Sequence, residues 1–288
     1  MILITGASGF VGKHLVEALN TCGLRCREVP FREGGEDVTG RLKLVDRHHG
    51  HDLTDVSTLT PLVNEKIDTV IHLASATPAA NVYSKDYFRT NVTGTINLLK
   101  SINKRHIKKI ILLSSISVYK INKDADTYFR EDSEITTLQE SPYGYSKYLQ
   151  ESLIQEYCSK HSIGYVIFRA SSIYGRGMPP TLISIFNEKS KRNENLEITT
   201  KNYKQNFIYV GDVVELVKQA RDSDVTGIYN LFSDCTLDIE QLAKTIISIN
   251  NSSSDILKKY NSEDKYNKIY YNTKLHRDFN FKFIPMGE

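Results

Sequence analysis

The sequence predicts an α/β fold, with a doubly wound parallel sheet and a small C-terminal substrate lobe, on three observations. Short runs of continuous apolar residues recur along the first half of the chain, as in parallel strands that are buried on both faces. Stretches with apolar residues at helical spacing separate these runs. The chain also begins with a strand, a glycine-spaced turn and a helix. Together these patterns predict a sheet domain over residues 1–170 and a lobe over residues 171–288, from which segments can return to the sheet.

The first predicted element is the strand Ile2–Ile4, which leads directly into the turn Thr5-Gly6-Ala7-Ser8-Gly9-Phe10-Val11-Gly12. Gly6 permits a tight turn, Gly9 leaves room for a phosphate, and Gly12 lets the next helix pack closely on the strand. The N-terminal amides of that helix then face an anion. This order is how a backbone approaches the pyrophosphate of a dinucleotide, so the turn predicts a dinucleotide site. The alternative is a glycine-rich loop that binds no ligand.

The next elements of the first half alternate in the same way. Apolar runs predict strands at Val70–Ala74, Ile110–Leu113 and Val166–Phe168. Helical spacing runs through Val92–Leu99 and Leu149–Tyr157. This alternation predicts helices on both faces of one parallel sheet.

The pattern is weaker after Arg169. Phe207–Val210 has the composition of a strand, and Ile239–Ile249 has the spacing of an amphipathic helix. The polar stretches Asn193–Lys204 and Asn250–Lys268 are poorly patterned and predict loops. These segments are expected to form the smaller lobe.

The composition is that of a soluble enzyme, with 288 residues, of which 40% are hydrophobic and 25% charged. A net charge of only +3 leaves no electrostatic basis for binding a nucleic acid or a membrane surface. No apolar run approaches the roughly 20 residues that span a bilayer. Met1 is followed at once by the first strand, which leaves no room for a signal peptide. We therefore expect a cytoplasmic protein.

The cysteines and histidines predict neither a disulfide framework nor a metal site. The four cysteines, Cys22, Cys26, Cys158 and Cys235, lack paired spacing and are expected to be reduced thiols. His48, His49 and His51 cluster in one polar stretch, which is typical of a solvated loop when no further ligands are near.

Tyr143 and Lys147 are the candidate catalytic pair. They are four residues apart in a predicted helix that begins after Ser141-Pro142, so they share one face. The lysine ammonium can then lower the pKa of the phenol and also reach the ribose of a cofactor. Ser114 and Ser115 end a predicted strand, at the sheet edge where ligands of such folds bind.

Several ordered motifs lie between residue 1 and about residue 235. They are Thr5-Gly6-Ala7-Ser8-Gly9-Phe10-Val11-Gly12, Asp52-Leu53, His72-Leu73-Ala74-Ser75, Asn91-Val92-Thr93-Gly94-Thr95, Ser114-Ser115-Ile116-Ser117-Val118-Tyr119, Ser141-Pro142-Tyr143-Gly144-Tyr145-Ser146-Lys147 and Tyr209-Val210-Gly211-Asp212. Their order resembles that of the extended short-chain dehydrogenase/reductases. Within this group the chain is similar to the NAD-dependent epimerase/dehydratase family, which acts on nucleotide sugars.

The resemblance implies a Rossmann sheet, an NAD(P) cofactor, and a substrate that is a nucleotide-diphosphate sugar. It makes Tyr143 the proton donor or acceptor, Lys147 its activator and a ribose ligand, and Ser115 the hydroxyl that holds the sugar oxygen. The implied cofactor-binding residues are Gly6, Ser8, Gly9, Phe10, Val11, Gly12, Asp52, Leu53, Leu73, Ala74, Ser75, Asn91, Tyr143 and Lys147. The implied substrate residues are Ser115, Ser117, Ser171, Ser172, Arg176 and Gln205.

Departures from the family pattern narrow the reaction. Ile116 stands where the 4,6-dehydratases of the family carry an acid, and it cannot transfer a proton, which argues against dehydration. The second strand, about Leu24–Phe31, is followed by Arg32 where an acid would accompany an unphosphorylated ribose. Arg32, with Arg27, can meet a 2′-phosphate, which predicts NADP. The alternative is NAD, with Glu33 or Glu36 at the ribose.

The substrate site departs as well, because Gln205 stands where similar epimerases carry an arginine for the diphosphate. Lys201, Lys204 or Arg192 can supply the missing charge. The favoured function is an NADP-dependent reductase of a 4-keto-6-deoxy nucleotide sugar. A 4-epimerase with retained NAD is the nearest alternative, and a non-catalytic cofactor-binding regulatory protein is the alternative from another class.

The resemblance also implies how the chain assembles. The helices near Asp86–Lys104 and Tyr143–Lys160 are expected side by side, and in similar family members this pair forms a four-helix interface. The large side chains expected to be exposed there are Tyr87, Phe88, Tyr148 and Tyr157. A two-fold contact would bury them, so we predict a homodimer.

Overall fold

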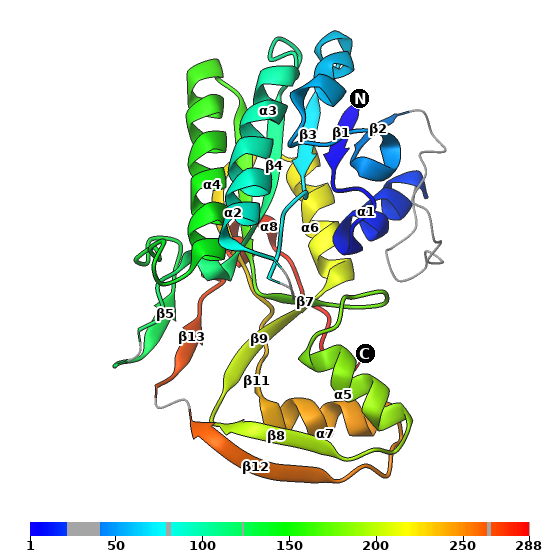
Figure 1. The fold of residues 1–288 in the computed structure, drawn as a ribbon, viewed down its shortest axis with the longest axis vertical. Helices are drawn as coiled ribbons and strands as arrows, with labels where there is room; N and C mark the ends of the chain where they lie inside the picture. Colours follow the sequence, from blue (N-terminus) through cyan, green and yellow to red (C-terminus); the bar gives the residue numbers. More distant parts are fainter. Residues whose placement is uncertain (22–40, 79–81, 123, 264–265, 288) are drawn as a thin grey trace.

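The computed structural model describes residues 1–21, 41–78, 82–122, 124–263 and 266–287. Among these residues, six strands form a parallel sheet in the order β10-β6-β4-β3-β1-β2 (Figure 1). They are β1 (Ile2–Thr5), β2 (Leu42–Val45), β3 (Thr69–His72), β4 (Lys109–Ser115), β6 (Gly164–Ala170) and β10 (Gly227–Leu231). The predicted α/β fold with a parallel sheet is confirmed. The strand predicted at about Leu24–Phe31 lies outside the described residues.

Helices cover both faces of the sheet (Figure 1). One face carries α1 (Phe10–Asn20), α6 (Val210–Asp222) and α8 (Thr273–Phe279), and the other α2 (Ser84–Tyr87), α3 (Gly94–Ser101) and α4 (Pro142–His161). A hydrophobic core lies on each face of the sheet, and neighbouring residues of one strand point into different cores. Ile71 belongs to the core under α1, whereas Val70 belongs to the core under α3 and α4. The strands are therefore apolar at successive positions, as their sequence indicates. Shorter helical turns are η1 (Arg47–His49), η2 (Val56–Asn64), η3 (Phe88–Thr93) and η4 (Ile116–Val118).

A smaller lobe lies beyond the carboxyl ends of the sheet strands (Figure 1). It contains α5 (Leu182–Lys191), α7 (Ile239–Ile249), the sheet β11 (Thr236–Asp238), β9 (Lys204–Tyr209) and β7 (Ser172–Tyr174), and the ribbon of β8 (Leu196–Lys201) and β12 (Ile256–Glu263). Its separate core includes Phe186, Ile198 and Leu242. A second ribbon pairs β5 (Thr127–Phe129) with β13 (Lys268–Tyr270).

The ribbon of β8 and β12 corrects the two predicted loops. β8 lies inside the stretch Asn193–Lys204, and β12 lies inside Asn250–Lys268. Only Leu196 and Ile198 of β8 are buried, and most of β12 is exposed. With so few buried side chains, neither strand carries the apolar run that identifies a strand in the sequence.

The second half of the chain also reaches the central sheet, because β10 pairs in parallel with β6 from Gly227 to Leu231. The division into two domains at residue 170 stays a prediction. None of the described helices combines the length and apolarity that crossing a membrane requires.

Candidate active site

The glycine turn at the end of β1 opens on a cavity of about 1020 Å³ between the sheet edge and the lobe. Gly6 has a φ of +70°, and a Cβ there would lie 2.8 Å from the backbone N of Ala74. A Cβ on Gly12 would lie 2.1 Å from the carbonyl O of Gly6. Both positions therefore exclude a side chain, for the reasons that the sequence predicts. Because α1 begins at Phe10, the N-terminal end of a helix forms part of the cavity wall.

Asp46, directly after β2, is a site residue that the sequence analysis missed. Its Oδ2 accepts a hydrogen bond of 2.7 Å from the backbone N of Ser8, inside the glycine turn. Its Oδ1 accepts from the backbone N of His49 at 3.2 Å and lies 2.7 Å from the ring Nδ1 of His49. Burial raises the pKa of Asp46, but the contacts with His49 and Ser8 outweigh it, so the pKa lies below 3.8. The side chain is an ionised carboxylate.

Asp46 lines a second cavity of about 290 Å³ beside the turn, together with the predicted residues Asp52, Leu53 and Ala74. A carboxylate at the end of the strand next to β1 suits the ribose hydroxyls of an unphosphorylated dinucleotide. The short strand Leu42–Val45, with three apolar residues and an acid directly after it, is the sequence signal that marks Asp46. Arg32, predicted at this position, lies outside the described residues.

Asn91 occupies a π-helical turn, η3, between α2 and α3, and it is fully buried. Its Oδ1 accepts from the backbone N of Ala76 at 2.8 Å and from Oγ of Ser75 at 3.0 Å. Its Nδ2 donates to the carbonyl O of Ala76 at 3.2 Å and to Oγ of Ser146 at 2.9 Å. Asn91 therefore ties the loop after β3 to α4.

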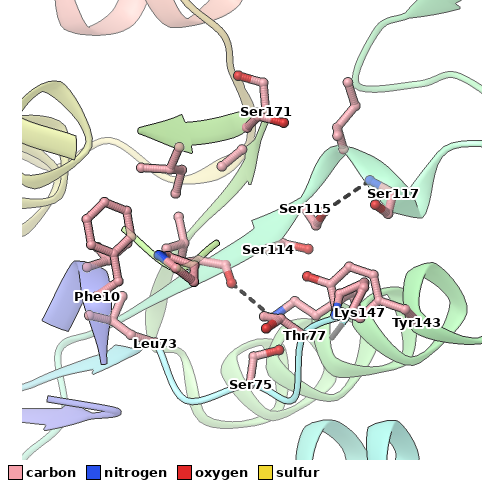
Figure 2. Close-up of a pocket in the computed structure, with 18 of the residues that line it drawn as sticks. Phe10, Leu73, Ser75, Thr77, Ser114, Ser115, Ser117, Tyr143, Lys147 and Ser171 are labelled. Atoms are coloured by element: carbon pink, nitrogen blue, oxygen red, sulfur yellow. Dashed lines mark hydrogen bonds between the residues drawn. The ribbon is translucent and has the colours of Figure 1, made fainter. Parts of the chain in front are cut away.

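Tyr143 and Lys147 project from the first turns of α4 toward the end of β4. The helix is started by Ser141, whose Oγ accepts from the backbone N of Gly144 at 3.0 Å, and by Pro142 in the first turn. Figure 2 shows Ser115, Tyr143 and Lys147 around one opening, with Phe10 and Leu73 across it and Ser171 on a further wall. The structure thus brings the three predicted catalytic side chains together with the glycine turn.

Tyr143 is held near the hydroxyls of Ser115 and Ser75. Burial raises the pKa of Tyr143 above its usual 10.0, although hydrogen bonding with these two serines lowers it in part. The ring of Tyr87 packs against the ring of Tyr143, with centroids 5.5 Å apart. Ser115 Oγ in turn accepts from the backbone N of Ser117 at 3.1 Å, which fixes its rotamer at the strand end.

Lys147 is only 1% exposed. Its Nζ donates to the carbonyl O of Leu113 at 2.9 Å and also to Oε1 of Gln150. Burial lowers the pKa of Lys147 to about 7, against the opposing influence of the Glu151 carboxylate. Its charge at neutral pH therefore depends on its immediate contacts.

Except for the buried Asn91, which lines neither cavity, the predicted cofactor residues in the described part of the chain divide between the two cavities. Those that line the larger one are Gly6, Ser8, Gly9, Phe10, Val11, Gly12, Leu73, Ser75, Tyr143 and Lys147. A dinucleotide that extends from Asp46 past the glycine turn to Tyr143 matches this arrangement of residues. When bound, NAD(P) would be held by these groups and would supply the hydride donor or acceptor.

The predicted substrate residues Ser115, Ser117, Ser171, Ser172 and Gln205 all line the larger cavity. Gln205 Nε2 donates to Oγ of Ser172, and its Oε1 accepts from the hydroxyl of Tyr203 at 3.0 Å. The predicted residue Arg176 is exposed and is not among the residues that line this cavity. Its carbonyl O instead lies 2.8 Å from Nε2 of His14.

The substrate end of the cavity has a lysine that the sequence analysis did not suggest. Lys268, on β13, lines the cavity with its Nζ 4.3 Å from the centre of the Tyr203 ring. Of the three cations suggested by the sequence, none lines the cavity, and two meet acids elsewhere: Lys201 meets Glu263 at 3.5 Å and Arg192 meets Glu194 at 3.1 Å. The described lining contains the three lysines Lys13, Lys147 and Lys268 and no carboxylate. The cavity therefore favours an anionic ligand.

The helices of the predicted dimer contact are adjacent, since α3 and α4 lie side by side (Figure 1). The four aromatic residues expected to be exposed there are each half-buried within one chain: Tyr87, Phe88, Tyr148 and Tyr157. The ring of Tyr87 packs against that of Tyr143. Among the residues that the structure describes, no group of three His, Cys, Asp or Glu side chains is placed to hold a metal ion.

Comparison with known proteins identifies relatives of this chain. The model of the NAD dependent epimerase/dehydratase family matches residues 2–231. A protein of Methanocaldococcus jannaschii described as a putative UDP-glucose 4-epimerase is 31% identical over 228 residues, which cover 75% of this chain and 71% of that protein. UDP-glucuronic acid decarboxylase 5 of Arabidopsis thaliana is 29% identical over 276 residues, which cover 91% of this chain and 78% of the relative.

Solved structures share the fold at lower identity. RMD from Pseudomonas aeruginosa complexed with NADPH has a TM-score of 0.79 and 22% identity, and the match covers 98% of this chain and 93% of that one. UDP-glucose 4-epimerase from Thermotoga maritima with UDP-glucose has a TM-score of 0.77 and 21% identity, with coverage of 98% and 93%. From the matched motifs, the cavity and these relatives, the chain belongs to the NAD dependent epimerase/dehydratase family.

Proposed function

We propose that this chain is an NAD(P)-dependent enzyme that acts on carbon 4 of a nucleotide-diphosphate sugar, with Ser115, Tyr143 and Lys147 as catalytic residues. The observation that carries the proposal is that these three side chains and the glycine turn line one cavity. Their convergence argues against a non-catalytic cofactor-binding role, which needs no proton donor beside the cofactor.

Tyr143 moves the proton in this scheme. When the sugar is oxidised, the Tyr143 oxygen would take the proton as the O4–H bond breaks, and a bound NAD(P) would supply the acceptor for the hydride of C4. Ser115 holds the same oxygen by a hydrogen bond. Because burial raises the pKa of Tyr143, a nearby positive charge is needed to make its phenolate accessible near neutral pH, and Lys147 supplies that charge.

Asp46 favours NAD over NADP. Its ionised carboxylate, held at the glycine turn, would accept hydrogen bonds from ribose hydroxyls and would repel a 2′-phosphate. A retained NAD would supply the hydride back to the same 4-keto sugar, and its delivery to the opposite face of C4 would give the 4-epimer, so the proposed reaction is 4-epimerisation. The sequence-based alternative, an NADP-dependent 4-keto-6-deoxy sugar reductase, rests on Arg32 and stays a prediction.

The substrate class follows from the wall of the cavity. Serine hydroxyls at positions 115, 117, 171 and 172 suit a sugar, and Lys268 suits a diphosphate. Among the similar solved structures, one contains UDP-glucose and another, MoeE5, contains UDP-glucuronic acid and NAD. We therefore propose a nucleotide-diphosphate sugar, for which UDP sugars are the first candidates.

The test is an assay of the purified protein with a panel of 4-hydroxy and 4-keto nucleotide sugars, with NAD, NADH, NADP or NADPH added separately. We expect interconversion of two 4-epimers that needs no net cofactor turnover. Stoichiometric oxidation of NADPH by a 4-keto sugar would instead establish the reductase. Absence of turnover across the panel, with cofactor bound, would support the regulatory alternative.

We also propose a cytoplasmic homodimer formed by α3 and α4, which lie together on one flank of the sheet (Figure 1). A two-fold contact between these helices would hold the helix of Tyr143 and Lys147 rigid. Light scattering at micromolar concentration measures the mass, and a monomer with full activity would contradict the proposal.

A further inference from the structure

Buried polar contacts link the catalytic lysine to the strand before the glycine turn. Gln150 and His72 are both fully buried. Gln150 Oε1 accepts from Nζ of Lys147, and its Nε2 lies 2.9 Å from Nε2 of His72. Gln150 Nε2 also donates to Oγ1 of Thr95, at 2.9 Å. Nδ1 of His72 lies 2.6 Å from Oγ1 of Thr5, the last residue of β1.

The charge of Lys147 sets the direction of these contacts. An ammonium group has only donors, so the Gln150 amide presents its oxygen to Lys147 and its NH₂ to His72. In the assignment where Nε2 of His72 accepts from this NH₂, the ring proton lies on Nδ1 and donates to Thr5. The same ring Nε2 also lies 2.9 Å from Oγ1 of Thr95. Burial, reinforced by the charge of Lys147, lowers the pKa of His72 to about 3, so the ring is neutral. A neutral ring in this tautomer holds the Gln150 amide in one orientation.

Gln150 provides the side-chain hydrogen-bond acceptor that the other groups around Lys147 do not. On α4, the Glu151 carboxylate is already paired with Arg169 of β6 at 2.7 Å, and Tyr143 is a neutral phenol below its pKa. From β3, the facing group is neutral His72, and from β4 it is the carbonyl of Leu113. Among the described residues, Gln150 is thus the side chain whose oxygen accepts directly from the ammonium.

We propose that Gln150 is a positioning residue whose amide, oriented by neutral His72, keeps the Lys147 side chain charged and fixed beside β4. The inference concerns the protonation of Lys147 and does not depend on which sugar the enzyme takes. A polar side chain buried this deeply is costly unless it is hydrogen-bonded, and here both ends of the amide have partners. The contact stabilises the ammonium form relative to the free amine.

The test is the titration of Lys147 in the full-length protein without added cofactor, followed by NMR of isotopically labelled lysine side chains. We expect Gln150→Leu to lower the midpoint by about one pH unit, the size of one hydrogen bond to a charged group. Gln150→Glu should raise the midpoint, because a carboxylate accepts more strongly and His72 can move its proton to Nε2 to follow. Gln150→Met provides the same loss if the leucine variant does not fold.

Gln155→Leu is the matched control, because Gln155 lies on the same helix. Its Nε2 donates to the hydroxyl of Tyr165 at 3.3 Å. It should leave the Lys147 midpoint unchanged. NADH affinity as a function of pH gives a second readout, because the ammonium form of Lys147 is the proposed donor to the ribose. NADH affinity should fall as Lys147 loses its proton at alkaline pH, and in Gln150→Leu this fall should begin at a lower pH. Equal midpoints for wild type, Gln150→Leu and Gln150→Met, or a lower midpoint for Gln150→Glu, would overturn the inference. Both readouts are independent of the sugar panel, so they remain decisive if the proposed reaction is wrong.

Discussion

The two ends of the cavity are built in different ways. At the cofactor end, buried polar groups are tied to one another across β1, β3, α3 and α4, as in the contacts of Asn91 and Gln150. At the substrate end, the wall includes half-buried side chains of the lobe and of the β5–β13 ribbon, among them Tyr203, Gln205 and Lys268. The first end presents fixed atoms that a common cofactor can use. The second can change side chains without disturbing the sheet, which is where members of one family are expected to differ in substrate.

The largest expected effect lies where the two ends meet. Tyr143→Phe removes the proton carrier and should lower turnover by about two to four orders of magnitude. Cofactor binding should be largely retained, because Lys147 and the glycine turn remain. Steady-state rates and an NADH titration measure both quantities. Tyr157→Phe, later on the same helix, is the control, and near-normal turnover in Tyr143→Phe would remove its catalytic role.

The buried network of the cofactor end predicts acid sensitivity through His72. In the unfolded chain His72 takes up a proton near pH 6.5, whereas in the folded protein it does so only near pH 3. The unfolded state therefore binds more protons between these values, and stability falls as the pH decreases from 6.5 to 3, by about 5 kcal/mol in total. Urea unfolding across this range measures the slope. His72→Gln should flatten it and exposed His106→Gln should not; a slope unchanged by His72→Gln would contradict the prediction.

Asp46 tests whether the cofactor end selects between cofactors. Asp46→Asn removes the charge while the side chain keeps its size, and it should weaken NADH binding by about tenfold. NADPH should lose less, because the repulsion of its phosphate is also removed. Fluorescence titration of both cofactors measures the ratio, with exposed Asp55→Asn as control. A wild-type preference for NADPH would show instead that Arg32 decides the choice.

Lys268 gives the smallest expected effect, at the substrate end. Lys268→Gln should raise the KM for a nucleotide sugar by about fivefold and leave kcat nearly unchanged. The reason is that the charge of Lys268 is expected to stabilise the bound substrate and the transition state equally. The difference should shrink at high salt. Lys259→Gln, on exposed β12, is the control. If kcat falls instead, Lys268 acts on the chemical step, and the substrate end does more than bind the substrate.

The parts that could be predicted from the sequence are those with local patterns. The glycine turn and the spacing of Tyr143 and Lys147 lie within short segments, and the structure places both in one cavity. Asp46 was missed because its hydrogen bond with Ser8 forms only when β2 pairs with β1, and these two strands are far apart in the sequence. Lys268 was missed because β13 pairs with β5, near residue 128, and no local periodicity reports so distant a partner. Gln150 carries no motif, and its role follows only from its buried neighbours.

The position of β10 has a consequence for synthesis of the chain. β6 becomes an inner strand only when Gly227–Leu231 pairs with Val166–Ala170, about sixty residues later. Until the ribosome has released that segment, β6 presents an open apolar edge, with Phe168 among its residues, to other nascent chains. Fragments that end before Gly227 are therefore expected to aggregate rather than fold, and chaperones that shield strand edges should raise the yield of the full-length protein.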